Sequence, residues 1–233
     1  MQRLTVVSSI IVFGALLAAA RQQPINARFD PASFKGGPID NPFFPLKPGT
    51  VYVYEVRDGG DVEVDSVTVT SETKRVAGVT AVVVHDRARR NGTLIEDTFD
   101  WYAQDTTGTV WYLGEDTKAY KLGRIASSSG SWEAGVKGAQ AGIIMLANPR
   151  PGVTYRQEYR QGVAEDMGKV VSVGDSVTVP TGRYTKCLTT EDWSPLEPKV
   201  REHKTYCPGV GVVLERTIAG GSERSELVAI RNP

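Results

Sequence analysis

Hydrophobic and polar residues alternate along most of the chain, which is the pattern of strands with one buried face. The alternation starts after Gly49 and continues through segments separated by turn residues. The predicted strands cover residues 51–56, 62–73, 80–90, 93–103, 110–113, 118–125, 153–159, 169–173, 176–179, 183–190, 199–207, 210–218 and 222–230. The pattern predicts an all-β fold, an antiparallel meander of about ten strands that forms a barrel, a half-barrel or a sandwich.

Two stretches break this alternation. Residues 21–48 are rich in proline and glycine, which disfavours a helix or a central strand. We expect an irregular N-terminal lead-in there, with residues 41–46 as an apolar clamp on the sheet. Residues 126–150 are rich in serine and glycine and contain a short apolar run at 143–146. We expect this second stretch to be a lid over one end of the sheet, or a segment that crosses its core.

The first twenty residues have the order of a secretory signal peptide. Arg3 precedes an apolar run over residues 4–17, and three alanines follow at 18–20. The run is shorter than the ~20 residues that a membrane span needs, so cleavage near Ala20 is favoured over an uncleaved anchor. The sequence therefore predicts a signal peptide at 1–20, the lead-in at 21–48 and one β-rich domain at 49–231. A periplasmic or extracellular location follows, with no integral membrane span after cleavage.

Charge and cysteine content narrow the function classes. The chain has 27 basic and 27 acidic residues, scattered along its length, which gives no electrostatic argument for binding nucleic acid. Cys187 and Cys207 are its two cysteines. In an exported protein such a pair usually forms a disulfide, and two thiols without a nearby histidine or third cysteine make a poor zinc site. We therefore predict the Cys187–Cys207 disulfide.

Several short motifs of turn and strand residues resemble those of known proteins. They lie at residues 48–54, 101–105, 108–112, 177–187 and 206–213. Together they resemble a loose group of exported, uncharacterised bacterial β-sheet proteins, some of them similar to the half-barrels that carry lipids or lipoproteins in the cell envelope. The resemblance implies the fold, the location and an apolar ligand. Its motifs contain no catalytic residues.

The common catalytic signatures are absent from the sequence. It has no nucleophile elbow, zinc-protease helix, paired-cysteine redox motif, phosphate-binding lysine loop or dinucleotide fingerprint. The two histidines, His85 and His203, stand alone, so each is expected to be a surface strand residue.

One set of acids can be placed by register. If Asn91-Gly92 is a two-residue hairpin turn, then Asp86 lies directly opposite Asp97, in line with apolar residues. Facing carboxylates repel, and a carboxylate in a core-side row is costly unless it is paired, protonated or bound to a cation.

The turn at Gly108 places a third acid near these two. A three-residue turn with a bulge brings in Glu115, and a plain two-residue turn brings in Asp116. The hypothesis is a cluster that binds a divalent cation such as calcium, with Asp86, Asp97 and Asp116 as ligands, or that shares a proton in acid–base work. The alternative is a set of rim acids that are solvated or neutralised by Arg and Lys.

Three functions are compatible with these observations. The preferred one is a non-enzymatic binding module for an apolar small molecule or lipid, without a cofactor other than a possible calcium ion. Its ligand-binding residues would be Trp101, Trp111, Ile143 and Met145. The first alternative is a small exported hydrolase or lyase using Asp86, Asp97 and Glu115, with or without a divalent metal. The second is a structural or interaction domain without a pocket.

Overall fold

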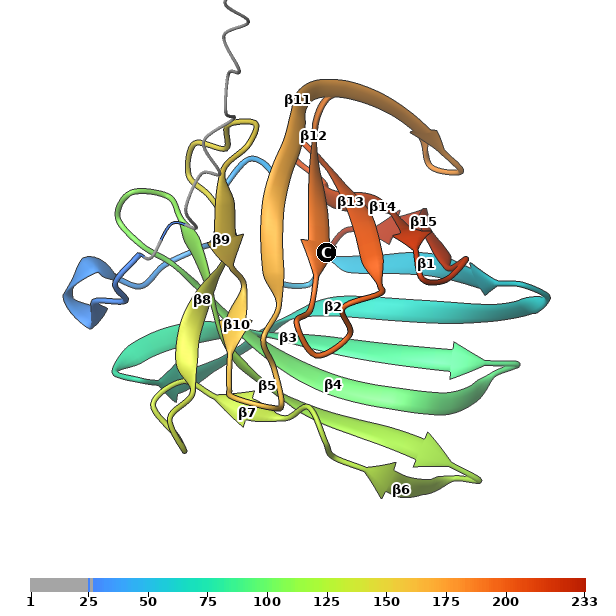
Figure 1. The fold of residues 1–233 in the computed structure, drawn as a ribbon, viewed down its shortest axis with the longest axis horizontal. Coiled ribbons are helices and arrows are strands. Elements are labelled where there is room, and N and C mark those ends of the chain that lie inside the picture. The colour runs from blue at the N-terminus through green and yellow to red at the C-terminus, as the bar shows by residue number, and fades with distance from the viewer. Residues whose placement is uncertain (1–24, 26) are drawn as a thin grey trace, which may run out of the picture.

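The computed structural model describes Ile25 and residues 27–233, and the predicted signal peptide lies outside them. These residues form one sheet whose paired strands are all antiparallel, so the all-β prediction is confirmed (Figure 1). One short 3₁₀ helix, η1 (Pro31–Ser33), precedes the sheet. The strands are β1 (Val51–Asp58), β2 (Asp61–Val76), β3 (Val79–Arg90), β4 (Thr93–Gln104), β5 (Val110–Lys121), β6 (Arg124–Ser127), β7 (Trp132–Glu133), β8 (Gln140–Met145), β9 (Thr154–Arg156), β10 (Glu158–Tyr159), β11 (Met167–Val179), β12 (Gly182–Trp193), β13 (Arg201–Cys207), β14 (Gly211–Ala219) and β15 (Arg224–Arg231).

The sheet is a meander that curls back on itself. Its order is β10-β8-β5-β4-β3-β2-β1-β15-β14-β13-β12-β11-β9, with the short strands β6 and β7 paired to β5. The two ends of this order, β9 and β10, are consecutive in the chain and separated only by Gln157. In Figure 1 strands β1–β5 run across the view, and β8–β12 pass over them in another direction. The sheet is therefore an open half-barrel whose concave face looks inward.

The hairpin turns follow the chemistry of their residues. Asn91 and Gly92 join β3 to β4 with φ angles of 51° and 76°, the left-handed pair that a type I′ turn requires. Asparagine and glycine adopt this conformation at little cost. The turn at 91–92 is thus confirmed.

The lead-in packs against the sheet as an irregular clamp, as predicted. Ile39 and Leu46 are buried, and a single β-bridge joins them. The buried side-chain amide of Asn41 donates hydrogen bonds to the carbonyls of Gly108 and Leu146. These contacts hold the clamp over one end of the half-barrel.

The expected lid is a strand of the sheet. Residues 140–145 form β8, which pairs with β5 on one side and with β10 on the other. In the sequence, the glycines at 135, 138 and 142 precede the apolar run at 143–146, so no alternating pattern marks a strand there. Pairing on both sides satisfies its backbone groups and places it in the sheet.

The cysteine prediction is confirmed. Cys187 on β12 and Cys207 on β13 form a disulfide between neighbouring strands, and both residues are fully buried. Within the described part of the chain, no helix has the length and apolar character of a membrane span.

Candidate functional site

The hairpin of β3 and β4 carries the predicted acids, and a bulge changes their pairing. Next to the turn Arg90 lies opposite Thr93, as predicted. Further along, Ala88 pairs with Glu96, which leaves Ile95 as an extra residue on β4. One extra residue shifts every later partner by one position and exchanges the two faces of the strand.

The predicted pairing of Asp86 with Asp97 is therefore wrong. Asp86 lies opposite Thr98, and Asp97 lies opposite Arg87. Cross-strand partners share a face, whereas successive residues of a strand point to opposite faces. The two acids thus lie on opposite faces of the sheet and cannot share a cation or a proton.

We call the face of Asp86 the inner face and the face of Asp97 the outer face. On the outer face the carboxylate of Asp97 lies 2.6 Å from Nε2 of His85. Asp116 is also on the outer face and lies 2.8 Å from Nζ of Lys118. The predicted metal ligands Asp86, Asp97 and Asp116 are therefore not brought together. Asp116, which pairs with Lys118, matches the alternative in which Arg and Lys neutralise the acids, whereas Asp97 is paired with a histidine.

The inner face holds a different row of acids, one from each of β2–β5. Asp86 on β3 is a diagonal neighbour of Asp65 on β2 and of Asp100 on β4. Asp100 lies opposite Glu115 on β5 and accepts a 2.6 Å hydrogen bond from the hydroxyl of Tyr112. Of the predicted acids, only Asp86 and Glu115 belong to this inner row.

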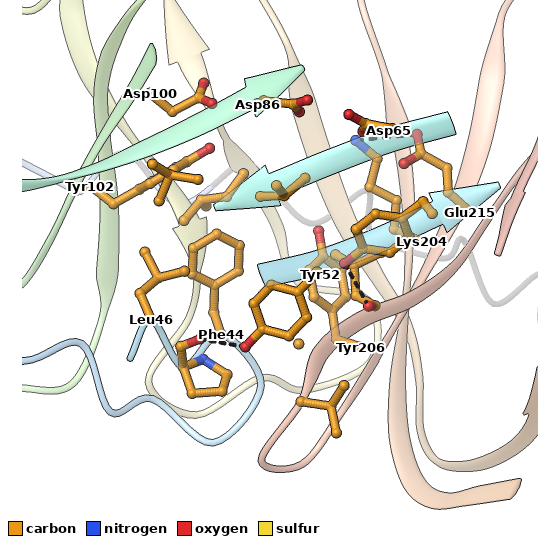
Figure 2. Close-up of a pocket in the computed structure, with 18 of the residues that line it drawn as sticks. Phe44, Leu46, Tyr52, Asp65, Asp86, Asp100, Tyr102, Lys204, Tyr206 and Glu215 are labelled. Carbon is orange, nitrogen blue, oxygen red and sulfur yellow. Dashed lines mark hydrogen bonds and ion pairs between the residues drawn. The ribbon is translucent and has the colours of Figure 1, made fainter. Parts of the chain in front are cut away.

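A cavity of about 250 Å³ lies against this row, between β1–β4 and the facing strands β13 and β14. Figure 2 shows the carboxylates of Asp65, Asp86 and Asp100 along one edge of the cavity, with aromatic rings beside and below them. The lining residues are Phe44, Pro45, Leu46, Tyr52, Tyr54, Asp65, Val67, Val84, Asp86, Asp100, Tyr102, Ile144, Lys204, Tyr206, Val210, Gly211, Val212, Glu215 and Ser225.

Aromatic contacts and hydrogen bonds hold the apolar wall of the cavity in place. The ring of Tyr102 stacks on Tyr112 at 4.8 Å between centroids and contacts Phe44 at 5.2 Å. The hydroxyl of Tyr54 donates to the carbonyl of Val212 at 3.0 Å, which ties β1 to β14 across the cavity. The wall is therefore built from side chains fixed by their neighbours.

Burial and mutual repulsion raise the pKa values of Asp86, Asp100 and Glu115. Burial raises the pKa of Asp86 well above its usual range, and the carboxyl of Asp65 raises it further. Burial raises the pKa of Asp100 to about 7, although the hydrogen bond from Tyr112 opposes this shift. Burial and the charge of Asp100 raise the pKa of Glu115 to about 8. These carboxyls therefore keep protons near neutral pH when no cation is beside them.

Lys204 on β13 lines the same cavity. Its ammonium lies 3.3 Å from the carboxylate of Glu215 and 3.8 Å from that of Asp192. The negative charge of Glu215 raises the pKa of Lys204 well above its usual range, against the effect of burial. The lysine is thus a charged group with two partners on its own side of the half-barrel.

The expected calcium ligands are not assembled. Among Ile25 and residues 27–233, no group of three or more His, Cys, Asp or Glu side chains has the geometry to hold a metal ion. The inner acids lie along a row, each on its own strand, whereas a calcium site needs about six to eight oxygens around one point.

The two tryptophans predicted to bind ligand are buried elsewhere. Trp101 lies on the outer face, where the ammonium of Lys74 sits 3.2 Å from the ring centroid. Trp111 packs edge-on against Phe29 and Phe34 of the lead-in. Neither ring lines the cavity beside the inner acids, although Trp101 and Lys74 line a separate hollow of about 340 Å³ on the outer face. A ligand-binding role of these tryptophans stays a prediction.

The prediction for β8 missed by one residue. Ile143 and Met145 are buried but are not part of the cavity lining. Ile144, which lies between them and points to the opposite side, lines the cavity. The alternation of the strand was present in the sequence, but the face that looks into the cavity was not identified.

Sequence reasoning also missed Asp65, Asp100 and the facing pair Lys204–Glu215. The reason lies in β4, which has two alternating rows of residues, and the sequence pattern allows either row to face the cavity. Thr98, Asp100 and Tyr102 form one row, and Phe99 and Trp101 form the other. The more apolar row was assigned to the inside, whereas the cavity is lined by the row that mixes tyrosine with acid.

Two solved structures are similar to this chain. A Bacteroides fragilis protein assigned as exported, with a YmcC-like fold, aligns over 82% of this chain and 99% of its own, with 15% identity and a TM-score of 0.49. A protein from Parabacteroides distasonis assigned as a lipoprotein aligns over 81% of this chain and 98% of its own, with 15% identity and a TM-score of 0.43. No protein-family model and no curated protein matches the sequence.

Proposed function

We propose that this chain is an exported binding protein that holds one small, largely apolar molecule in the half-barrel. The observation that supports this is the cavity between β1–β4 and β13–β14, lined by aromatic and aliphatic side chains and a few polar groups. Ligand sites are typically concave, mostly apolar and furnished with a few polar groups that orient the ligand. The proposal keeps the binding function predicted from the sequence and replaces its lining residues.

The size of the cavity limits the ligand. Its volume of about 250 Å³ lies below the roughly 300–1,000 Å³ of sites for drug-sized ligands. A compact molecule, or a single short alkyl chain, fits this space better than a lipid with two acyl chains. We therefore propose a small apolar ligand in place of a whole membrane lipid.

Export of the chain is supported by its first twenty residues. A basic residue, an apolar run and three alanines stand in the order of a signal peptide. The buried disulfide between Cys187 and Cys207 suits an oxidising compartment. A binding protein in the periplasm or outside the cell meets its ligand without crossing a membrane.

The binding of N-phenyl-1-naphthylamine, a neutral dye that fluoresces in apolar sites, tests the proposal. Ile144→Trp places a large side chain in the cavity and should abolish binding, since Ile144 lines it. Ile125→Trp is the matched control, because Ile125 is 57% exposed on β6 and does not line the cavity. The control should bind the dye as the unaltered protein does.

Two results would count against the proposal. One is an unaltered protein that does not bind the dye and from which mass spectrometry recovers no small molecule. The other is equal loss of dye binding in both tryptophan variants. Thermal unfolding of each variant, measured in parallel, shows that a loss of binding occurs in a folded protein.

A further inference from the structure

The wall of the cavity carries more negative than positive groups. Its lining includes the carboxyls of Asp65, Asp86, Asp100 and Glu215 and one ammonium, that of Lys204. Glu215 lies 3.3 Å from this ammonium and forms its partner. The other three acids, on β2, β3 and β4, therefore face the cavity without a basic partner among the described residues.

One of these acids has an unsatisfied oxygen. Oδ1 of Asp65 is buried and accepts no hydrogen bond from an N–H group or a hydroxyl of any described residue, and the carboxyl of Asp86 is the one described side chain within hydrogen-bond reach of Asp65. A buried acceptor without a donor costs free energy, and the cost is higher for a charged group. A ligand that brings an N–H donor to this edge of the cavity would remove that cost.

Lys204 does not supply that donor. Its ammonium is held by Glu215 and by Asp192, whose carboxylate lies 3.8 Å away. Both partners belong to β12 and β14, the strands on either side of β13. Moving the ammonium to the acids of β2–β4 would leave two carboxylates on its own side unpaired, so the lysine stays where it is.

The rest of the lining suits a cation attached to an apolar group. The rings of Tyr52, Tyr102 and Tyr206 line the same cavity as the three acids, as Figure 2 shows. The face of an aromatic ring attracts a cation, most strongly where water is excluded. Phe44 and Ile144 add apolar surface for the rest of the ligand.

We propose that the ligand of this cavity is a protonated amine with a short apolar tail, whose ammonium is held by Asp65, Asp86 and Asp100. This inference rests on the proposed function and names the chemical class of its ligand. The ammonium donates to the unsatisfied oxygen of Asp65 and neutralises the row of acids. The tail lies against the aromatic and aliphatic wall.

Three small molecules with the same tail and different charge test the inference. Hexylammonium, 1-hexanol and hexanoate are titrated calorimetrically into the full-length mature protein near neutral pH, where the amine is protonated. We expect hexylammonium to bind at least about tenfold more tightly than 1-hexanol, with hexanoate the weakest.

Asparagine variants test the residues. Asp86→Asn and Asp100→Asn should each reduce the preference for hexylammonium over 1-hexanol at least about tenfold. Asparagine keeps the shape of aspartate and can still accept the hydrogen bond that Tyr112 donates to Asp100, so the fold is preserved. Asp116→Asn is the matched control, because Asp116 lies on the outer face beside Lys118 and should not affect selectivity.

The outcomes separate the two proposals. Equal binding of all three molecules, together with binding of the neutral dye, overturns the amine inference and leaves the apolar binding site standing. A preference for hexanoate also overturns it and shows that Lys204 dominates the site. Failure of all three molecules and of the dye overturns the proposed function itself. Equal effects of Asp100→Asn and Asp116→Asn would reject the assigned residues.

Discussion

His85 and Asp97 form a pair across β3 and β4 on the face of the sheet that looks away from the cavity. Nε2 of the imidazole lies 2.6 Å from the carboxylate, and both side chains are about one-fifth exposed, at 22% and 21%. The imidazole also stacks on the ring of Phe99 at 4.0 Å between centroids. His85 is therefore a structural residue of this hairpin. The bulge at Ile95 places Asp97 on the same face of the sheet as His85, so the two side chains can meet.

Removing the charge of Asp97 should destabilise the protein without affecting ligand binding. Asp97→Asn weakens a partly buried hydrogen bond, so we expect the free energy of unfolding to fall by about 1 kcal/mol in urea titrations. Asp116→Asn removes an acid that is 48% exposed beside Lys118 and should change stability by less than about 0.5 kcal/mol. A larger loss in Asp116→Asn than in Asp97→Asn would contradict the assignment.

The fold could be predicted because its signals are local. The period-two alternation and turn pairs such as Asn91-Gly92 define strands one hairpin at a time. Antiparallel neighbours in a meander then follow in sequence order, as β1–β5 do. The half-barrel shape is not local in this sense. It depends on the pairing of β9 with β11 and of β10 with β8, at the two opposite ends of the strand order.

The site could be predicted only in part, because it depends on single-residue shifts. The extra residue Ile95 decides which side of β4 faces inward, and neither a proline nor a glycine marks it. Asp86 was assigned to a core-side row and does lie on the inner face, but its neighbours are Asp65 and Asp100. The contribution of β13 and β14 comes from residues far away in sequence, so no hairpin register could reveal it.

The protein without ligand should lose stability as the pH rises. The pKa of Asp100 is about 7 in the folded protein, against an ordinary value of 3.8, and that of Glu115 is about 8, against 4.5. An acid with a raised folded pKa binds protons more tightly in the folded state, so its stabilisation is complete below about pH 4 and is lost as the pH rises through about 7 for Asp100 and about 8 for Glu115. Urea titrations across this range should show a falling free energy of unfolding.

The variant Asp100→Asn isolates one of these groups. Asparagine resembles the protonated acid, so the variant should match the unaltered protein near pH 5 and be more stable than it near pH 8. Asp116→Asn should not change the slope with pH, because Asp116 lies at the outer face. Stability that rises between these pH values, or an unchanged slope in Asp100→Asn, would show that the inner carboxyls are ionised.

Removing the disulfide should reduce stability substantially. Cys187 and Cys207 are 20 positions apart, and a cross-link that closes a loop of this length stabilises a fold by about 3 kcal/mol in the chain-entropy account. The double variant Cys187→Ala and Cys207→Ala should lose about this amount in urea titrations. A reducing agent should lower the stability of the unaltered protein and leave that of the double variant unchanged. Equal sensitivity of both proteins to the reductant would contradict the prediction.

The junction between the two ends of the sheet should not tolerate a side chain at Gly142. A Cβ atom there would collide with the backbone carbonyl of Gln157, the residue that links β9 to β10. Gly142→Ala should therefore cost about 1–3 kcal/mol, the range for overpacking a close contact. Gly60→Ala is the control, since no heavy atom lies within 4 Å of its added Cβ. If both variants unfold at the same urea concentration, the two ends of the half-barrel do not meet at Gly142.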